Sequence, residues 1–90
     1  MYKIVSVKTF FSNNHPFIQK MVVQIDVLNN GLCQTETYER IIDGSKSTIH
    51  DDLPEKHVFY YKNVDGFTYK TSAENAASIF AQADFMGDTE

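Results

Sequence analysis

The densest group of side chains that could bind a metal or transfer protons lies between residues 50 and 57. Its members are two histidines and three carboxylates: His50, Asp51, Asp52, Glu55 and His57. Imidazole and carboxylate groups ligate Zn²⁺ and other divalent ions. The spacing fits no established metal motif, and adjacent aspartates before a proline are equally typical of a solvated loop. We therefore expect no metal and no other cofactor, and we keep a small metal-binding protein or enzyme as the last alternative.

Other routes to catalysis have little support in the sequence. Cys33 is the only cysteine, and a thiol nucleophile needs a neighbouring base. A lone cysteine early in a predicted strand is more often a small buried apolar residue, which is what we expect here. The four glycines are far apart, so they form no phosphate-binding loop. The sequence predicts that the protein is not an enzyme.

The charge is unevenly distributed along the chain. The net charge is −4, with +1 over residues 1–42 and −5 over residues 43–90. Nucleic-acid binding requires a basic face, and here the basic residues are scattered and outnumbered, so we do not expect it. The expected partner is another protein. The acidic second half also permits a small inhibitor or immunity-type protein that blocks a basic site on an enzyme or nucleic-acid-binding complex, with Asp51, Asp52 and Glu55 as contact residues.

Aromatic residues are the most informative part of the sequence. Five of the twelve lie close together near the second predicted turn: Phe59, Tyr60, Tyr61, Phe67 and Tyr69. Alternation along a strand places Tyr60 and Tyr61 on opposite faces, and only one face needs to pack on a helix. Exposed tyrosines are common anchors in protein interfaces, so both are candidates for partner binding, unless Tyr60 packs beneath residues 43–56. Phe11 is a third candidate, because it faces away from its neighbour Phe10.

Five segments have the composition of β-strands: residues 2–11, 18–28, 32–42, 57–63 and 67–70. The second of them alternates strictly between apolar and polar side chains. Asn30-Gly31 and Asp65-Gly66 predict tight hairpin turns. The polar third segment is expected at a sheet edge or over a solvated face, and an exposed edge there would allow a homo-oligomer.

A helix is predicted at the C-terminal end. Thr71 and Glu74 have the spacing of a capping box, with Thr71 as the N-cap. Four apolar residues then form one stripe at helical spacing: Ala76, Ile79, Phe80 and Ala83. Gly87 is placed to end the helix, and we expect residues 88–90 to be frayed.

The predicted fold is α+β, a five-stranded, mainly antiparallel sheet with one C-terminal helix packed on one face. Ninety residues are too few for a second core, so residues 1–90 are expected to form one domain. No apolar run approaches the length that crosses a bilayer, and no signal peptide is recognisable. These features predict an intracellular, cytoplasmic or virion-associated protein without a membrane partner.

Two short stretches resemble the small outer-capsid decoration proteins of T-even-type phages. One is Val7-Lys8-Thr9-Phe10, and the other runs from Gly66 to Thr71 and continues through Ser72, Glu74, Ala76 and Ala77. The resemblance implies a non-enzymatic clamp bound between neighbouring capsid subunits. The function that we expect from the sequence is thus a protein-binding module that docks on a larger protein or assembly, with capsid decoration as a special case.

Overall fold

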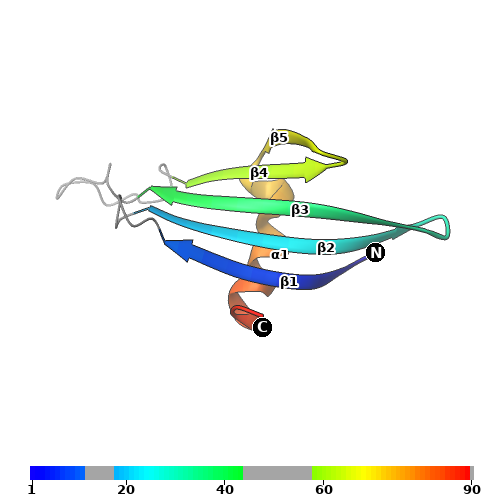
Figure 1. Ribbon diagram of the computed structural model, residues 1–90, viewed down its shortest axis with the longest axis horizontal. Helices are drawn as coiled ribbons and strands as arrows, with labels where there is room; N and C mark the ends of the chain where they lie inside the picture. The colour runs from blue at the N-terminus through cyan, green and yellow to red at the C-terminus, as the bar shows by residue number, and fades with distance from the viewer. Residues whose placement is uncertain (12–17, 44–57, 90) are drawn as a thin grey trace.

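The computed structural model describes residues 1–11, 18–43 and 58–89 (Figure 1). Five strands precede one helix: β1 (Tyr2–Phe11), β2 (Ile18–Asn29), β3 (Leu32–Asp43), β4 (Val58–Val64), β5 (Phe67–Thr71) and α1 (Ala73–Met86). The strands form one sheet in the order β1-β2-β3-β4-β5, and every neighbouring pair is antiparallel. The predicted α+β fold is therefore confirmed. Of the predicted strand residues, His57 lies outside the described part of the chain.

Both predicted hairpin turns are confirmed by their backbone angles. Asn30 and Gly31 have φ values of 53° and 80°, and Asp65 and Gly66 have values of 53° and 84°. Two successive residues with positive φ form the turn whose twist matches the right-handed twist of the flanking strands. Asparagine, aspartate and glycine adopt this conformation at the lowest steric cost, so the turn sequences set the register of both hairpins.

The third strand was expected either at a sheet edge or over a solvated face, and the edge position is wrong. β3 is the middle strand, paired with β2 along its whole length and with β4 from Glu36 to Ile42. From Glu36 to Ile42 the backbone of β3 is thus already paired on both sides, and the expected homo-oligomer through an exposed edge strand stays a prediction. β3 is polar because one of its faces is solvated, which was the other expectation. Thr35, Thr37 and Glu39 alternate with the inward-facing Tyr38 and lie on the side of the sheet away from the helix.

A bulge in β1 changes which side chains face the helix. The pairing with β2 shifts by one residue between Ile4 and Ser6. Beyond the bulge Val7 pairs with the buried Val23, and before it Ile4 pairs with the buried Ile25. An extra residue in one strand reverses the alternation at that point, so side chains three positions apart reach the same face.

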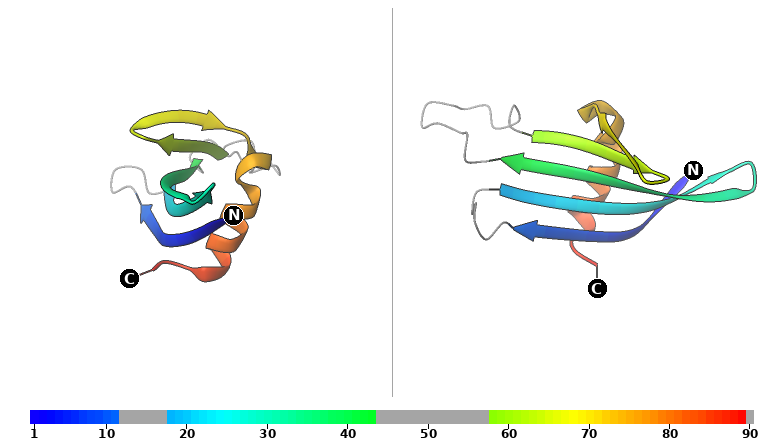
Figure 2. Two further views of the ribbon diagram at one scale, coloured as in Figure 1. Left: turned by 90° about the vertical axis from the view of Figure 1, so that its right-hand side faces the viewer. Right: turned by 45° about the horizontal axis from the view of Figure 1, so that its top comes forward.

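The core lies between one face of the sheet and α1, which crosses the strands (Figures 1 and 2). The predicted stripe Ala76, Ile79, Phe80 and Ala83 is buried against residues of the three N-terminal strands: Val7, Met21, Val23, Ile25 and Tyr38. Two of the four helix residues are alanines, which let the helix approach the sheet closely. The helix begins one residue later than predicted. Ser72, not Thr71, is the N-cap and accepts a hydrogen bond from the Asn75 amide at 3.2 Å, because Thr71 still pairs with Tyr60 in the sheet.

Arg40 joins the centre of the sheet to the last part of α1. Its guanidinium donates two hydrogen bonds to the Asp84 carboxylate, at 2.9 and 2.7 Å, and lies 5.1 Å from the centroid of the Phe80 ring. The hydrogen bond to Asp84 raises the pKa of Arg40, and burial of the side chain opposes this effect. The pair is a bidentate ion pair at the edge of the core.

Residues 88 and 89 are not frayed, contrary to expectation, and Glu90 lies outside the described residues. Gly87, with φ 73°, ends the helix and donates its amide to the Ala83 carbonyl at 3.0 Å. Thr89 then exchanges hydrogen bonds with Val7, donating its amide to the Val7 carbonyl at 2.8 Å and accepting from the Val7 amide at 2.9 Å. Asp88 accepts from the Thr9 amide and hydroxyl at 3.2 and 2.7 Å. The free edge of β1 supplies these unpaired groups, and we call residues 88–89 the C-terminal latch.

Candidate functional site

The sheet has a helix-covered face and a face that no described element covers, which we call the open face. The register places on it the side chains that alternate with the buried Met21, Val23 and Ile25 and with their cross-strand neighbours. Its apolar and charged members include Lys3, Lys8, Phe10, Lys20, Val22, Glu39, Ile41, Phe59, Tyr61 and Lys70.

Apolar side chains and lysines are interleaved on the open face. Phe10 is 51% exposed, and Val22, Ile41, Phe59 and Tyr61 are half-buried by their neighbours in the sheet. A hollow of about 330 Å³ lies over β1 and β2, lined by Ser6, Lys8, Phe10, Lys20, Val22 and Gln24. Lys20 reaches Glu39 at 3.5 Å, where both side chains remain partly exposed. The result is an apolar band with cationic side chains along it.

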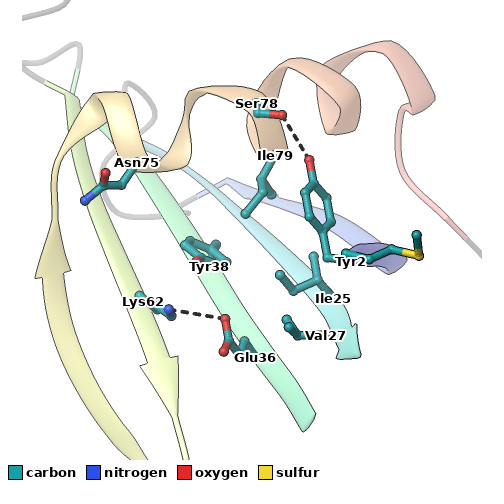
Figure 3. A pocket seen from close by; sticks show the side chains of 10 residues that line it. Tyr2, Ile25, Val27, Glu36, Tyr38, Lys62, Asn75, Ser78 and Ile79 are labelled. Atoms are coloured by element: carbon teal, nitrogen blue, oxygen red, sulfur yellow. Dashed lines mark hydrogen bonds and ion pairs between the residues drawn. The ribbon is translucent and has the colours of Figure 1, made fainter. Parts of the chain in front are cut away.

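A second concave surface lies on the helix side of the sheet, between α1 and the outer ends of the strands (Figure 3). We call it the hairpin groove, because β2 and β3 form most of its floor before they continue into their shared hairpin. Its volume is about 350 Å³, and its lining residues are Met1, Tyr2, Ile25, Val27, Glu36, Tyr38, Lys62, Asn75, Ser78 and Ile79. In Figure 3, Asn75, Ser78 and Ile79 extend from the helix above the sheet residues.

Most polar groups in the groove are paired within it. The Lys62 ammonium lies 3.3 Å from the Glu36 carboxylate and 5.6 Å from the centroid of the Tyr38 ring. Burial lowers the pKa of Lys62, but its hydrogen bonds to Tyr38 and Glu36 outweigh that effect and raise the pKa. The Tyr2 and Ser78 hydroxyls are 3.0 Å apart, and Gln82 donates to the Tyr2 hydroxyl at 3.0 Å. The groove is therefore apolar at its base and has no net charge.

Exposed apolar side chains surround the groove. Phe67 and Tyr69 on β5 are 65% and 55% exposed, and the register places them beside Val64 and Lys62 on the helix side. Leu32, at the end of the β2–β3 hairpin, is 75% exposed. Exposed aromatic and aliphatic side chains around a concave surface are typical of a contact region rather than of a solvated surface.

The three predicted partner-binding residues that the structure describes do not lie on one face of the sheet. Tyr61 lies on the open face and Tyr60 on the other, so the prediction that they occupy opposite faces is confirmed. Tyr60 lies on the helix side, half-buried, with its ring 5.5 Å from that of Phe80. Phe11 is 68% exposed at the end of β1, also on the helix side, opposite Gln19. Their role in binding remains a prediction, and so does that of Asp51, Asp52 and Glu55, which lie outside the described residues together with His50 and His57.

Sequence reasoning missed the polar residues of the groove. Glu36 and Tyr38 share the parity of the buried positions in β3, which could have placed them on one face. Their contact with Lys62 depends on the register between β3 and β4, and no pattern in the sequence sets that register. Cys33 was expected to be buried, but it is exposed, because the β2–β3 hairpin extends beyond the strands on either side of it.

Neither a metal-binding cluster nor a membrane-spanning helix is found among the described residues. Among residues 1–11, 18–43 and 58–89, no three His, Cys, Asp or Glu side chains are grouped so that they could hold a metal ion. In the same part of the chain, no helix has the length and apolar character needed to span a bilayer. Comparison with protein-family models, with curated proteins and with solved structures finds no match to this chain.

Proposed function

We propose that this protein is a non-enzymatic binding module that docks on a larger protein or assembly through its open face. The observation that carries the proposal is that α1 covers one side of the sheet, while no described element covers the apolar band on the other side. An apolar centre with charged side chains around it is the usual anatomy of a protein interface. Tyr61 and Phe59 would be its anchors, since aromatic side chains contribute most per residue to binding.

The charges of the open face indicate the chemistry of the partner. Four of the six basic residues in the described part of the chain lie on this face, namely Lys3, Lys8, Lys20 and Lys70. The other two, Arg40 and Lys62, are on the helix side and are paired with Asp84 and Glu36. Three carboxylates, Asp26, Glu39 and Asp43, share the face with the four lysines, so its described charge is +1. In a protein of net charge −4, this positive balance favours a partner that presents carboxylates around an apolar patch.

Capsid decoration is one form that such docking would take. The resemblance to phage decoration proteins includes Val7-Lys8-Thr9-Phe10, and the register places Lys8 and Phe10 of this stretch on the open face. A decoration protein needs a surface that fits a repeated site on a lattice. The resemblance thus supports the same face as the distribution of apolar and charged side chains.

The experiment compares two tyrosines on opposite faces. The partner is first recovered with tagged protein from the native lysate or particle, and its affinity is then measured by titration calorimetry with purified components. Tyr61→Ala should weaken binding by about 2 kcal/mol, roughly 30-fold, as expected for an aromatic anchor. Tyr69→Ala, on the helix side, should leave the affinity unchanged. Equal losses for both variants, with both folded, would remove the open face as the docking surface.

A further inference from the structure

The β2–β3 hairpin extends beyond the rest of the sheet (Figures 1 and 2). β1 pairs with β2 only as far as Val27, and β4 pairs with β3 only from Glu36. Beyond these pairs, residues 28–33 have only one another as strand partners, Leu28 with Cys33 and Asn29 with Leu32, around the Asn30-Gly31 turn. One backbone hydrogen bond, from the Leu28 amide to the Met1 carbonyl at 3.1 Å, ties the base of this free part to the chain before β1. A two-stranded hairpin without further strands on either side is marginally stable in water unless it packs against something else.

The composition of this hairpin is that of a contact surface. Residues 27–35, Val-Leu-Asn-Asn-Gly-Leu-Cys-Gln-Thr, contain no charged side chain. Leu28 and Leu32 are 54% and 75% exposed. Projecting hairpins in monomeric proteins normally carry charges that prevent association. The absence of charge here favours an occupant that is uncharged as well.

The two leucines face opposite sides of the hairpin. Leu28 pairs with Cys33 on the side of the open face, whereas Leu32 has the parity of Glu36 and Tyr38 and lies on the side of the hairpin groove. The groove begins where the free part of the hairpin ends: Val27, which pairs with Tyr2, lines the groove and directly precedes Leu28. One continuous surface therefore carries a projecting leucine and, next to it, a concave apolar site.

We propose that the hairpin groove binds the β2–β3 hairpin of a second copy of this chain. Leu32 of each copy packs into the groove of the other, against Ile79 and the Tyr38 ring, so that the contact is made twice about a two-fold axis. A projection and a complementary hollow on one surface give an isologous interface, which closes as a dimer.

The absence of local charge is compatible with a second copy as the occupant. Two chains of net charge −4 repel each other, and a contact between surfaces without net charge adds nothing to that repulsion. The hairpin has no charged residue, and the charged groups that line the groove, Glu36 and Lys62, neutralise each other. This interface lies on the helix side, so it leaves the open face free, and the proposal stands apart from the docking function.

The first test compares two leucine variants of the full chain. Sedimentation equilibrium over a wide range of protein concentration should show a monomer–dimer equilibrium for the natural sequence. Leu32→Asp should raise the dimer dissociation constant at least about tenfold, because it places a carboxylate in an apolar groove. Leu28→Asp introduces the same charge on the same hairpin but on the opposite side, and it should leave the constant unchanged. Both positions are exposed, so neither change should disturb folding.

The second test joins the two surfaces covalently. One sample carries Cys33→Ser with Leu32→Cys, and a second, with a different tag, carries Cys33→Ser with Asn75→Cys. Mixed under mild oxidation, they should form a disulfide-linked dimer that contains one chain of each kind, detected by its mass. Replacing Asn75→Cys by Lys8→Cys, on the open face, should abolish that product.

Three results would overturn the proposal. The first is a monomer at every concentration. The second is a dimer that Leu32→Asp and Leu28→Asp weaken equally, or that neither variant weakens. The third is a disulfide product as abundant with Lys8→Cys as with Asn75→Cys. None of these results would alter the Tyr61 and Tyr69 comparison, so the docking function and the dimer can fail separately.

Discussion

Arg40 shows how much one polar side chain can contribute to the packing of this small core. Its side chain is 14% exposed, and it donates two hydrogen bonds to Asp84. Asp84 lies in the last turn of α1, where the helix dipole disfavours a carboxylate and where the helix has no basic residue of its own. Arg40 supplies the missing positive charge from the sheet, so one contact stabilises both the helix end and the position of the helix on the sheet.

We therefore predict that Arg40→Met lowers the free energy of unfolding by about 1–3 kcal/mol, the range for hydrogen bonds between charged groups that are partly buried. Methionine keeps an unbranched apolar chain beside Phe80, so the loss reports mainly the guanidinium. The measurement is urea denaturation followed by circular dichroism.

The matched control is Lys20→Met, which removes one partner of an ion pair whose side chains are 44% and 31% exposed. Exposed pairs contribute less than about 1 kcal/mol. If Lys20→Met costs as much as Arg40→Met, the contact between Arg40 and Asp84 does not have the role assigned to it.

At the scale of elements, the C-terminal latch protects the edge of β1. The Val7 and Thr9 amides point away from β2 and bond Thr89 and Asp88 instead. An edge strand with unpaired amides is a template for pairing with another chain. The latch has only two residues, and it uses both backbone and side-chain groups to form hydrogen bonds with the outer edge of β1.

We predict that the double variant Asp88→Ala, Thr89→Ala increases amide hydrogen exchange locally. Each lost hydrogen bond is worth about 0.5–1.5 kcal/mol, so exchange at Val7 and Thr9 should accelerate by up to roughly tenfold. The Val23 amide, in a strand paired on both sides, serves as the internal control in the same NMR experiment. Equal acceleration at Val23 would mean that the variant destabilises the whole fold and that the latch has no separate role at the edge.

Comparison of the helix and strands with the latch shows how far the sequence predicts this fold. The strands, both turns and the helix stripe follow from local patterns: alternation in β2, Asn-Gly and Asp-Gly pairs, and helical spacing from Ala76 to Ala83. Such signals are local because each depends on residues a few positions apart. The bulge after Ile4 and the latch on Val7 leave no local signal, since each is defined by a partner strand or by residues some 80 positions away.

The candidate surfaces were predictable only in part, for the same reason. Alternation alone separates Tyr61 from Tyr60, but the packing of Tyr60 against Phe80 is what shows that Tyr61 lies on the open face. The groove requires the register between β3 and β4, which brings Lys62 to Glu36, and a helix that starts at Ala73 so that Asn75 and Ser78 border it. The groove depends both on the β3–β4 register and on the position of the helix, so no short stretch of the sequence predicts it.

At the scale of the whole molecule, the basic residues are unevenly distributed between the two faces, although the open face also carries three carboxylates, Asp26, Glu39 and Asp43. Four lysines lie on the open face, and α1 with the latch carries Glu74, Asp84 and Asp88 but no basic residue. The hairpin that projects from the sheet is uncharged. The two proposed contacts therefore differ in electrostatics: the open face attracts carboxylates, whereas the hairpin and groove join surfaces without net charge on two chains that repel each other.

This difference predicts opposite responses to salt. Added salt shortens the screening length from about 10 Å at roughly 0.1 M to about 3 Å at roughly 1 M. Screening weakens the attraction between the lysines and an acidic partner, so docking through the open face should weaken. It also removes the repulsion between two chains of charge −4, so the dimer should strengthen. Calorimetry with the purified partner and sedimentation equilibrium of the protein alone, at both salt concentrations, measure the two responses. A dimer that dissociates as salt is added would be held by charge pairs, which the hairpin does not possess, and the self-association surface would then have to be sought elsewhere.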